Sequence, residues 1–128
     1  MTAIQTLSAP LGRLLLSLIF VVSGVGKIGA YAGTQAYMDS MGVPGVLLPL
    51  VIVLEVLGGL AIILGWQARV VAFLLAGFCL LSAVIFHGNI GDQGQQIQFL
   101  KNLGLAGGFL LIVAHGAGAW SLDNRRGA

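Results

Sequence analysis

Residues 47–65, LLPLVIVLEVLGGLAIILG, decide the fold of this 128-residue chain. The stretch is apolar except for Glu55, and at about 1.5 Å per residue it matches the hydrocarbon core of a bilayer. An ionised side chain at mid-membrane costs roughly a few kcal/mol, so such a residue normally faces the inside of a helix bundle. Gly58 and Gly59 follow on the same helix face and let a second helix approach closely. We therefore expect Glu55 to point into a contact between helices.

The composition of the chain is that of an integral membrane protein embedded in a lipid bilayer. Hydrophobic residues make up 58% of the chain and charged residues 8%, whereas about a quarter of the residues in a soluble domain are charged. The few basic residues form no patch, which excludes a nucleic-acid partner. Cys79 is the single cysteine, so the sequence excludes an internal disulfide and dithiol chemistry within one chain.

Four apolar segments predict a single all-α transmembrane domain with helices at about residues 11–28, 47–65, 69–87 and 97–115. Because the connections are short, the expected architecture is an integral membrane four-helix up-down bundle. Residues 29–42 are expected to form an interfacial loop or a short helix with aromatic anchors. Pro49 either marks the first turn of the second helix or bends that helix further in.

The basic residues are distributed unequally between the two ends of this bundle. One end is predicted to carry Arg13, Arg69, Arg125 and Arg126, and the other end Lys27 and Lys101. The positive-inside rule then predicts that both termini are cytoplasmic. A signal peptide is the rival interpretation of the first segment, but Lys27 in the would-be cleavage region favours a retained helix.

Lys101 lies about one turn inside the outer boundary of the last predicted helix. Helical side chains lean toward the N-terminus of their own helix, so Glu55 should lean toward the level of Lys101. We predict an intramembrane polar cluster of these two residues, with Lys27 and Asn102 as further members. The alternative is that Lys101 snorkels to the membrane surface and that Glu55 is protonated, because burial disfavours its charged form.

The two histidines do not suggest a haem site. His87 and His115 each lie near the C-terminal end of their helix, and the two helices run in opposite directions, so the side chains fall on opposite membrane faces. His87 is a candidate for the rim of an outward-facing pocket together with Asp92, or simply an interfacial polar residue. The spacing of the possible ligands does not indicate a metal site.

Several short motifs, spread over nearly the whole chain, resemble those of the DoxX family of small bacterial inner-membrane proteins. They are Gly12-Arg13-Leu14-Leu15, Ser23-Gly24-x-x-Lys27, Gly42-x-Pro44, Glu55-x-x-Gly58-Gly59, Arg69, Phe86-His87 and Gln96-x-Gln98-Phe99-Leu100-Lys101-Asn102-Leu103. The resemblance implies a multi-pass four-helix protein of the bacterial inner (cytoplasmic) membrane. It also implies, for some members, an association with quinone-linked sulfur oxidation or with defence against oxidative stress, but no agreed set of catalytic residues.

Three functions are compatible with these features. The first is a redox-associated oxidoreductase subunit in which Glu55, Lys101, Asn102 and His87 border a pocket for a quinone supplied by the membrane. The chain has no thiol pair, flavin motif or haem pair, so electrons would pass through a partner subunit. The second is a structural or assembly role without chemistry, and the third is a small proton-coupled transporter. The glycine and alanine stripes suit contacts within one chain or within a homo-oligomer.

Overall fold

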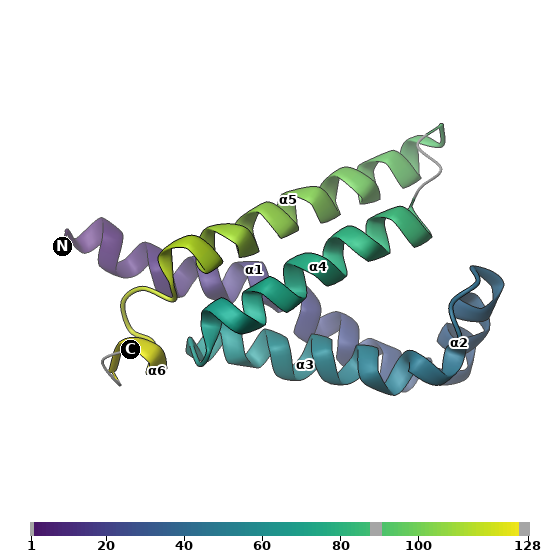
Figure 1. Cartoon of the computed structure of the whole chain (residues 1–128), viewed down its shortest axis with the longest axis horizontal. Coiled ribbons are helices and arrows are strands. Elements are labelled where there is room, and N and C mark those ends of the chain that lie inside the picture. Colours follow the sequence, from purple (N-terminus) through teal and green to yellow (C-terminus); the bar gives the residue numbers. More distant parts are fainter. Residues whose placement is uncertain (1, 88–90, 126–128) are drawn as a thin grey trace.

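The computed structural model describes residues 2–87 and 91–125, and these residues are almost entirely helical (Figure 1). The long helices are α1 (Ala3–Gly29), α3 (Leu48–Leu64), α4 (Ala68–Phe86) and α5 (Gln93–His115). The short elements are α2 (Tyr31–Ser40), the 3-10 helix η1 (Gly45–Leu47) and α6 (Leu122–Arg125). In the described ranges, four helical segments are long and apolar enough to cross a membrane, with η1 and α3 forming one of them. The predicted all-α membrane fold is confirmed.

Two of the long helices begin earlier than their apolar segments. Helix α1 begins at Ala3, where Thr2 and Gln5 form a capping box, so Pro10 lies inside the helix. Helix α5 begins at Gln93, because the carboxylate of Asp92 accepts a hydrogen bond from the backbone N–H of Gln95. Apolar periodicity marks the part of a helix that lipid can surround, whereas polar caps mark where the helix starts.

The connection between the first two spans contains helix α2, which lies at one end of the molecule (Figure 1). Asp39 accepts a hydrogen bond of 2.7 Å from the backbone N–H of Gly45, and Gln35 donates one of 3.2 Å to the Gly45 carbonyl. These bonds hold α2 against η1. Pro49 lies in the first turn of α3, where it leaves the rest of the helix undisturbed.

Helices α1 and α3 pack closely because glycines face the partner helix. A Cβ atom added to Gly59 would lie 2.8 Å from Cγ2 of Val21, and one added to Gly24 would lie 2.5 Å from Cγ2 of Val56. Gly58, next to Gly59, faces α4 instead. Gly58 and Gly59 therefore allow α3 to pack closely against α4 and α1, respectively.

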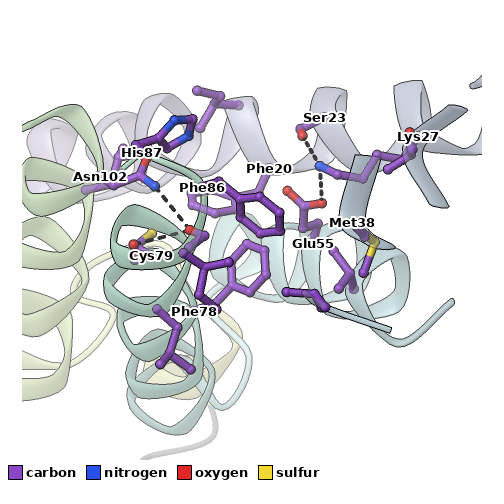
Figure 2. Close-up of a pocket in the computed structure, with 18 of the residues that line it drawn as sticks. Phe20, Ser23, Lys27, Met38, Glu55, Phe78, Cys79, Phe86, His87 and Asn102 are labelled. Atoms are coloured by element: carbon purple, nitrogen blue, oxygen red, sulfur yellow. Dashed lines mark hydrogen bonds and ion pairs between the residues drawn. The ribbon is translucent and has the colours of Figure 1, made fainter. Parts of the chain in front are cut away.

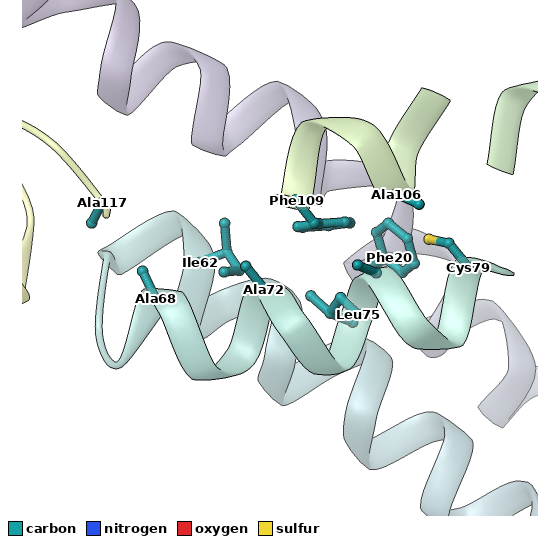
Figure 3. Close-up of a cluster of buried hydrophobic side chains, with 10 residues drawn as sticks. Phe20, Ile62, Ala68, Ala72, Leu75, Cys79, Ala106, Phe109 and Ala117 are labelled. Carbon is teal, nitrogen blue, oxygen red and sulfur yellow. The ribbon is translucent and has the colours of Figure 1, made fainter. Parts of the chain in front are cut away.

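A buried apolar cluster joins the four long helices (Figure 3). Helices α1, α3, α4 and α5 contribute Phe20, Ile62, Leu75 and Phe109, respectively. The rings of Phe20 and Phe109 meet edge to face with centroids 5.3 Å apart. This cluster holds the α1–α3 pair against the α4–α5 pair.

Arg13 is buried at the end of the bundle opposite α2, with 2% of its surface exposed. Its guanidinium donates to the carbonyls of Ile62 and Ile63, 3.4 and 2.9 Å away, near the end of α3. It also donates to the carbonyls of Ala119 and Trp120, 2.8 and 2.9 Å away. Carbonyls at a helix end lack partners within the helix, and Arg13 is the partner of the Ile63 carbonyl, whereas the Ile62 carbonyl also accepts from the backbone N–H of Gly65. The sequence had placed this residue at the membrane surface.

The segment after α5 folds back across the same end of the bundle. The carboxylate of Asp123 accepts hydrogen bonds from the backbone N–H groups of Gln67 and Ala68, 2.7 and 2.8 Å away, and so caps the start of α4. The backbone N–H of Asp123 donates to the Gly65 carbonyl at 2.9 Å. Asp123 and Arg13 together join the C-terminal segment to α1, α3 and α4.

Arg13→Gln is expected to lower the free energy of unfolding by about 3 kcal/mol or more, because a shorter neutral amide leaves buried carbonyls unpaired. The measurement is denaturation by sodium dodecyl sulfate in detergent micelles, followed by circular dichroism. The matched control is Arg69→Gln, since Arg69 is exposed and makes no hydrogen bond or ion pair within residues 2–87 and 91–125. Equal destabilisation by the two changes would contradict the role given to Arg13.

Candidate functional site

The site is built around Glu55, whose side chain is 4% exposed in the middle of α3. The Nζ atom of Lys27, on α1, lies 2.7 Å from its Oε1 atom and forms an ion pair with it. Lys27 also donates to the Oγ atom of Ser23 at 2.7 Å (Figure 2). Because Gly24 brings α3 close to α1, Lys27, one turn further along, can reach back to the carboxylate.

Lys101, which the sequence suggested as the main partner of Glu55, is bonded elsewhere. Its ammonium group donates to Gln98 on the same helix, and its side chain is exposed. Helix α3 packs mainly against α1, whereas α5 packs mainly against α4. The pairing of Glu55 with Lys101 is therefore replaced by its pairing with Lys27, because α1 is the closer neighbour of α3.

A second polar group joins α4 and α5. The side-chain amide of Asn102 donates to the Oγ atom of Ser82 at 3.1 Å, and Ser82 donates to the Cys79 carbonyl at 3.2 Å. Near the end of α4, the Nδ1 atom of His87 lies 2.8 Å from the side-chain oxygen of Gln95. These contacts join the two helices in their apolar surroundings.

Both polar groups line one cavity of about 380 Å³ (Figure 2). Most of its lining is apolar, with aromatic walls from Phe20, Tyr37, Phe78 and Phe86. The polar lining side chains are Ser23, Lys27, Thr34, Glu55, Ser82, His87, Lys101 and Asn102. The residues predicted to form the polar cluster thus border the same cavity, and among them a hydrogen bond or ion pair joins only Lys27 and Glu55. Asp92, predicted at the rim, does not line the cavity and instead caps α5.

Helix α2 covers one end of the cavity, whose lining includes its residues Thr34, Tyr37 and Met38. Tyr37 stacks on Phe86 of α4, with ring centroids 5.4 Å apart and planes inclined by 25°. Met38, beside it, is buried and also lines the cavity. Sequence reasoning treated Tyr37 as a surface anchor and did not place it at the site. An aromatic residue in a weakly amphipathic connection gives no signal that distinguishes the two positions.

The chemistry of the site is that of proton exchange and hydrogen bonding. Over the described ranges, no group of three or more histidine, cysteine, aspartate or glutamate residues could hold a metal ion. Cys79 is a buried free thiol in the cavity wall. The carboxylate of Glu55, the ammonium of Lys27 and the amide of Asn102 are among the groups that can recognise a polar ligand atom here.

The Lys27–Glu55 pair is expected to behave as one unit in a double-mutant cycle. Lys27→Met should destabilise the protein by about 3 kcal/mol, because it leaves the buried Glu55 carboxylate uncompensated, and Glu55→Leu should destabilise it less, because Lys27 is partly exposed and keeps its bond to Ser23. The double variant should lose less than the sum of the two, with a coupling energy of about 1–3 kcal/mol. The same denaturation assay measures all four proteins, and strictly additive losses would contradict the pairing.

Comparisons with known proteins agree with this architecture. The model of the DoxX family matches residues 9–88. The inner membrane protein YqjF of Escherichia coli (strain K12) is 47% identical, over 96% of this chain and 95% of its own length. The inner membrane protein YphA of the same strain is 38% identical, over 90% of this chain and 87% of its own length. No solved structure matches. The chain therefore belongs to the DoxX family.

Proposed function

We propose that this protein resides in a bacterial inner membrane and binds a quinone-like molecule in the cavity beside Glu55, as a subunit of a redox system. The observation that supports the proposal most is an ion pair with a buried carboxylate, which lines a mainly apolar cavity with aromatic walls. Ligand sites commonly combine about 300–1,000 Å³ of apolar space with a few polar groups, and the volume here is about 380 Å³. The relatives YqjF and YphA, both inner membrane proteins by name, support the location.

The residues of the cavity fit a flat ring that carries two oxygens. Phe20 and Phe86 offer aromatic surface for the ring, and Lys27 and Asn102 offer N–H donors from opposite helix pairs. Carbonyl oxygens of a quinone accept hydrogen bonds from such donors. The cavity thus supplies both the apolar and the polar contacts that this ligand class requires.

A quinone, when bound, supplies two-electron redox chemistry coupled to protons. Glu55 would pass protons to and from the ligand oxygens, and Lys27 would orient its carboxylate through the ion pair. Ser23, bonded to the same ammonium group, would fix the position of Lys27. Electrons would come from a partner subunit, because the chain carries only one cysteine and no thiol pair.

A structural role is the second candidate, because the ion pair also fixes the register of α1 against α3. In that case Glu55 would matter for stability and for nothing else. A proton-coupled transporter is a further alternative, in which the same carboxylate would carry protons across the membrane. The binding experiment below separates the first candidate from the other two.

Purified protein in detergent is expected to bind decylubiquinone, and Glu55→Gln is expected to weaken binding at least tenfold, because a neutral amide no longer forms the ion pair that holds the Lys27 ammonium in place as a donor to the ligand. Equilibrium binding by titration calorimetry measures the effect. The matched control is His115→Gln, since His115 lies at the other end of the molecule and outside the cavity. Absence of binding to the unaltered protein, together with lower stability of Glu55→Gln, would support the structural role instead.

We also propose that both termini face the cytoplasm. Arg13 and Arg69 lie at the end where α1 begins and α6 lies, and Lys27 and Lys101 lie toward the other end (Figure 1). Arg125, the last residue of α6, adds to the first group, whereas Arg126 lies outside the described residues. The excess of arginine at the first end favours its retention in the cytoplasm.

Cysteine labelling in spheroplasts tests this orientation. In a Cys79→Ala background, Ser40→Cys at the end of α2 is expected to react with a membrane-impermeant maleimide, because it would face the periplasm. Asn124→Cys in α6 is expected to react only after the membrane is permeabilised. Both positions are exposed. The reverse pattern of labelling would contradict the proposed orientation.

A further inference from the structure

A second cavity of about 380 Å³ lies at the opposite end of α4 from the first. Its lining includes Arg69 and Gln67 at the start of α4, His115 at the end of α5, and residues of the segment that follows. This end of the bundle carries the buried Arg13 described above, but Arg13 does not line the cavity. The function proposed for Glu55 makes no use of it.

Arg69 is the cationic side chain of this cavity. It is exposed, and within the part of the chain that the structure describes it forms no ion pair or hydrogen bond. Its guanidinium lies against Gly116, where an added Cβ atom would be 3.3 Å from Nε. Gly116 also has a φ of +81°, a backbone angle that residues with a side chain rarely adopt. The glycine therefore leaves the room that the guanidinium occupies.

The wall beside Arg69 contains further hydrogen-bond donors. Among the described residues, no acceptor contacts the backbone N–H groups of Ala117 and Gly118, which both belong to the cavity lining. His115 adds a ring N–H at the end of α5. The acidic residue of the lining, Asp123, already accepts from two backbone N–H groups at the start of α4. The exposed side chains of Arg69 and His115 are the donors that an anion in this cavity would meet.

Exposed apolar side chains continue from this cavity along α4. Val70 and Phe73 are 60% and 64% exposed, on a helix that is apolar enough to lie in lipid. Trp66, also exposed, precedes them at the level of an interfacial anchor. A ligand with an anionic head and an acyl chain would therefore find a donor-lined cavity and an apolar helix face next to each other.

We propose that this cavity binds the phosphate group of an anionic phospholipid, with Arg69 as its main ligand and His115 as a second. A guanidinium matches a phosphate by two parallel hydrogen bonds, which a neutral side chain cannot provide. Basic pockets between transmembrane helices are a known way to hold anionic headgroups. The same donors would also bind free inorganic phosphate, so the experiment tests both the lipid and inorganic phosphate.

Native mass spectrometry of the full chain in detergent tests the proposal with phosphatidylglycerol, with phosphatidylcholine of the same acyl chains and with inorganic phosphate. The unaltered protein is expected to bind phosphatidylglycerol at least tenfold more tightly than phosphatidylcholine. Arg69→Gln should reduce this preference to within about twofold. The control is Lys101→Gln, which removes one positive charge at the other end of the molecule and should leave the preference unchanged. If the unaltered protein binds inorganic phosphate but shows no preference between the two lipids, and Arg69→Gln abolishes the phosphate binding, the site belongs to free phosphate.

Equal binding of the two lipids without phosphate binding, or an unchanged preference in Arg69→Gln, would overturn the proposal. Arg69→Lys provides a second variant if Arg69→Gln does not fold, because it keeps the charge and loses the planar pair of donors. Its affinity for phosphatidylglycerol should fall by about threefold or more, and an undiminished affinity would assign the effect to charge alone and so overturn the proposed phosphate contact. Circular dichroism of each variant verifies its helical fold.

Discussion

The contact between α1 and α3 is the constraint on which the rest of the structure depends, and both of its ends are fixed by cationic side chains of α1. Lys27 binds Glu55 at one end, and Arg13 binds the carbonyls that close α3 at the other. Between them, Gly24 and Gly59 keep the helices close. Sliding or rotation of α1 would separate charged groups from their partners in a medium of low dielectric, so this pair of helices is a rigid wall for the cavity.

The local features of the sequence predicted much of this wall. A lone carboxylate in an apolar span has to face protein, and glycines on its face indicate a close helix contact; Glu55 and Gly59 are placed accordingly. The partner of Glu55 could not be predicted in the same way. Helical periodicity tells which face a residue occupies but not which helix stands opposite. The choice of Lys27 over Lys101 depends on that adjacency.

The features that the sequence did not reveal depend on contacts between distant segments. Arg13 was counted as a surface charge because the acceptors from the C-terminal segment enter only when that segment folds back. Tyr37 reaches the cavity because α2 folds over the ends of the long helices, and its ring stacks on Phe86. Neither arrangement follows from hydropathy or spacing within one element. The cavity itself arises where large and small side chains of different helices leave space between them.

The bonds between Arg13 and the C-terminal segment have a consequence for biogenesis. Ala119 follows Arg13 by 106 positions, so during translation the first helix leaves the ribosome long before two of the carbonyls that receive its guanidinium exist. Until then the guanidinium lacks two of the four carbonyl acceptors that it contacts in the folded protein. The final residues therefore complete the assembly, and a polypeptide released before Ala119 would leave uncovered a charge that the finished protein conceals.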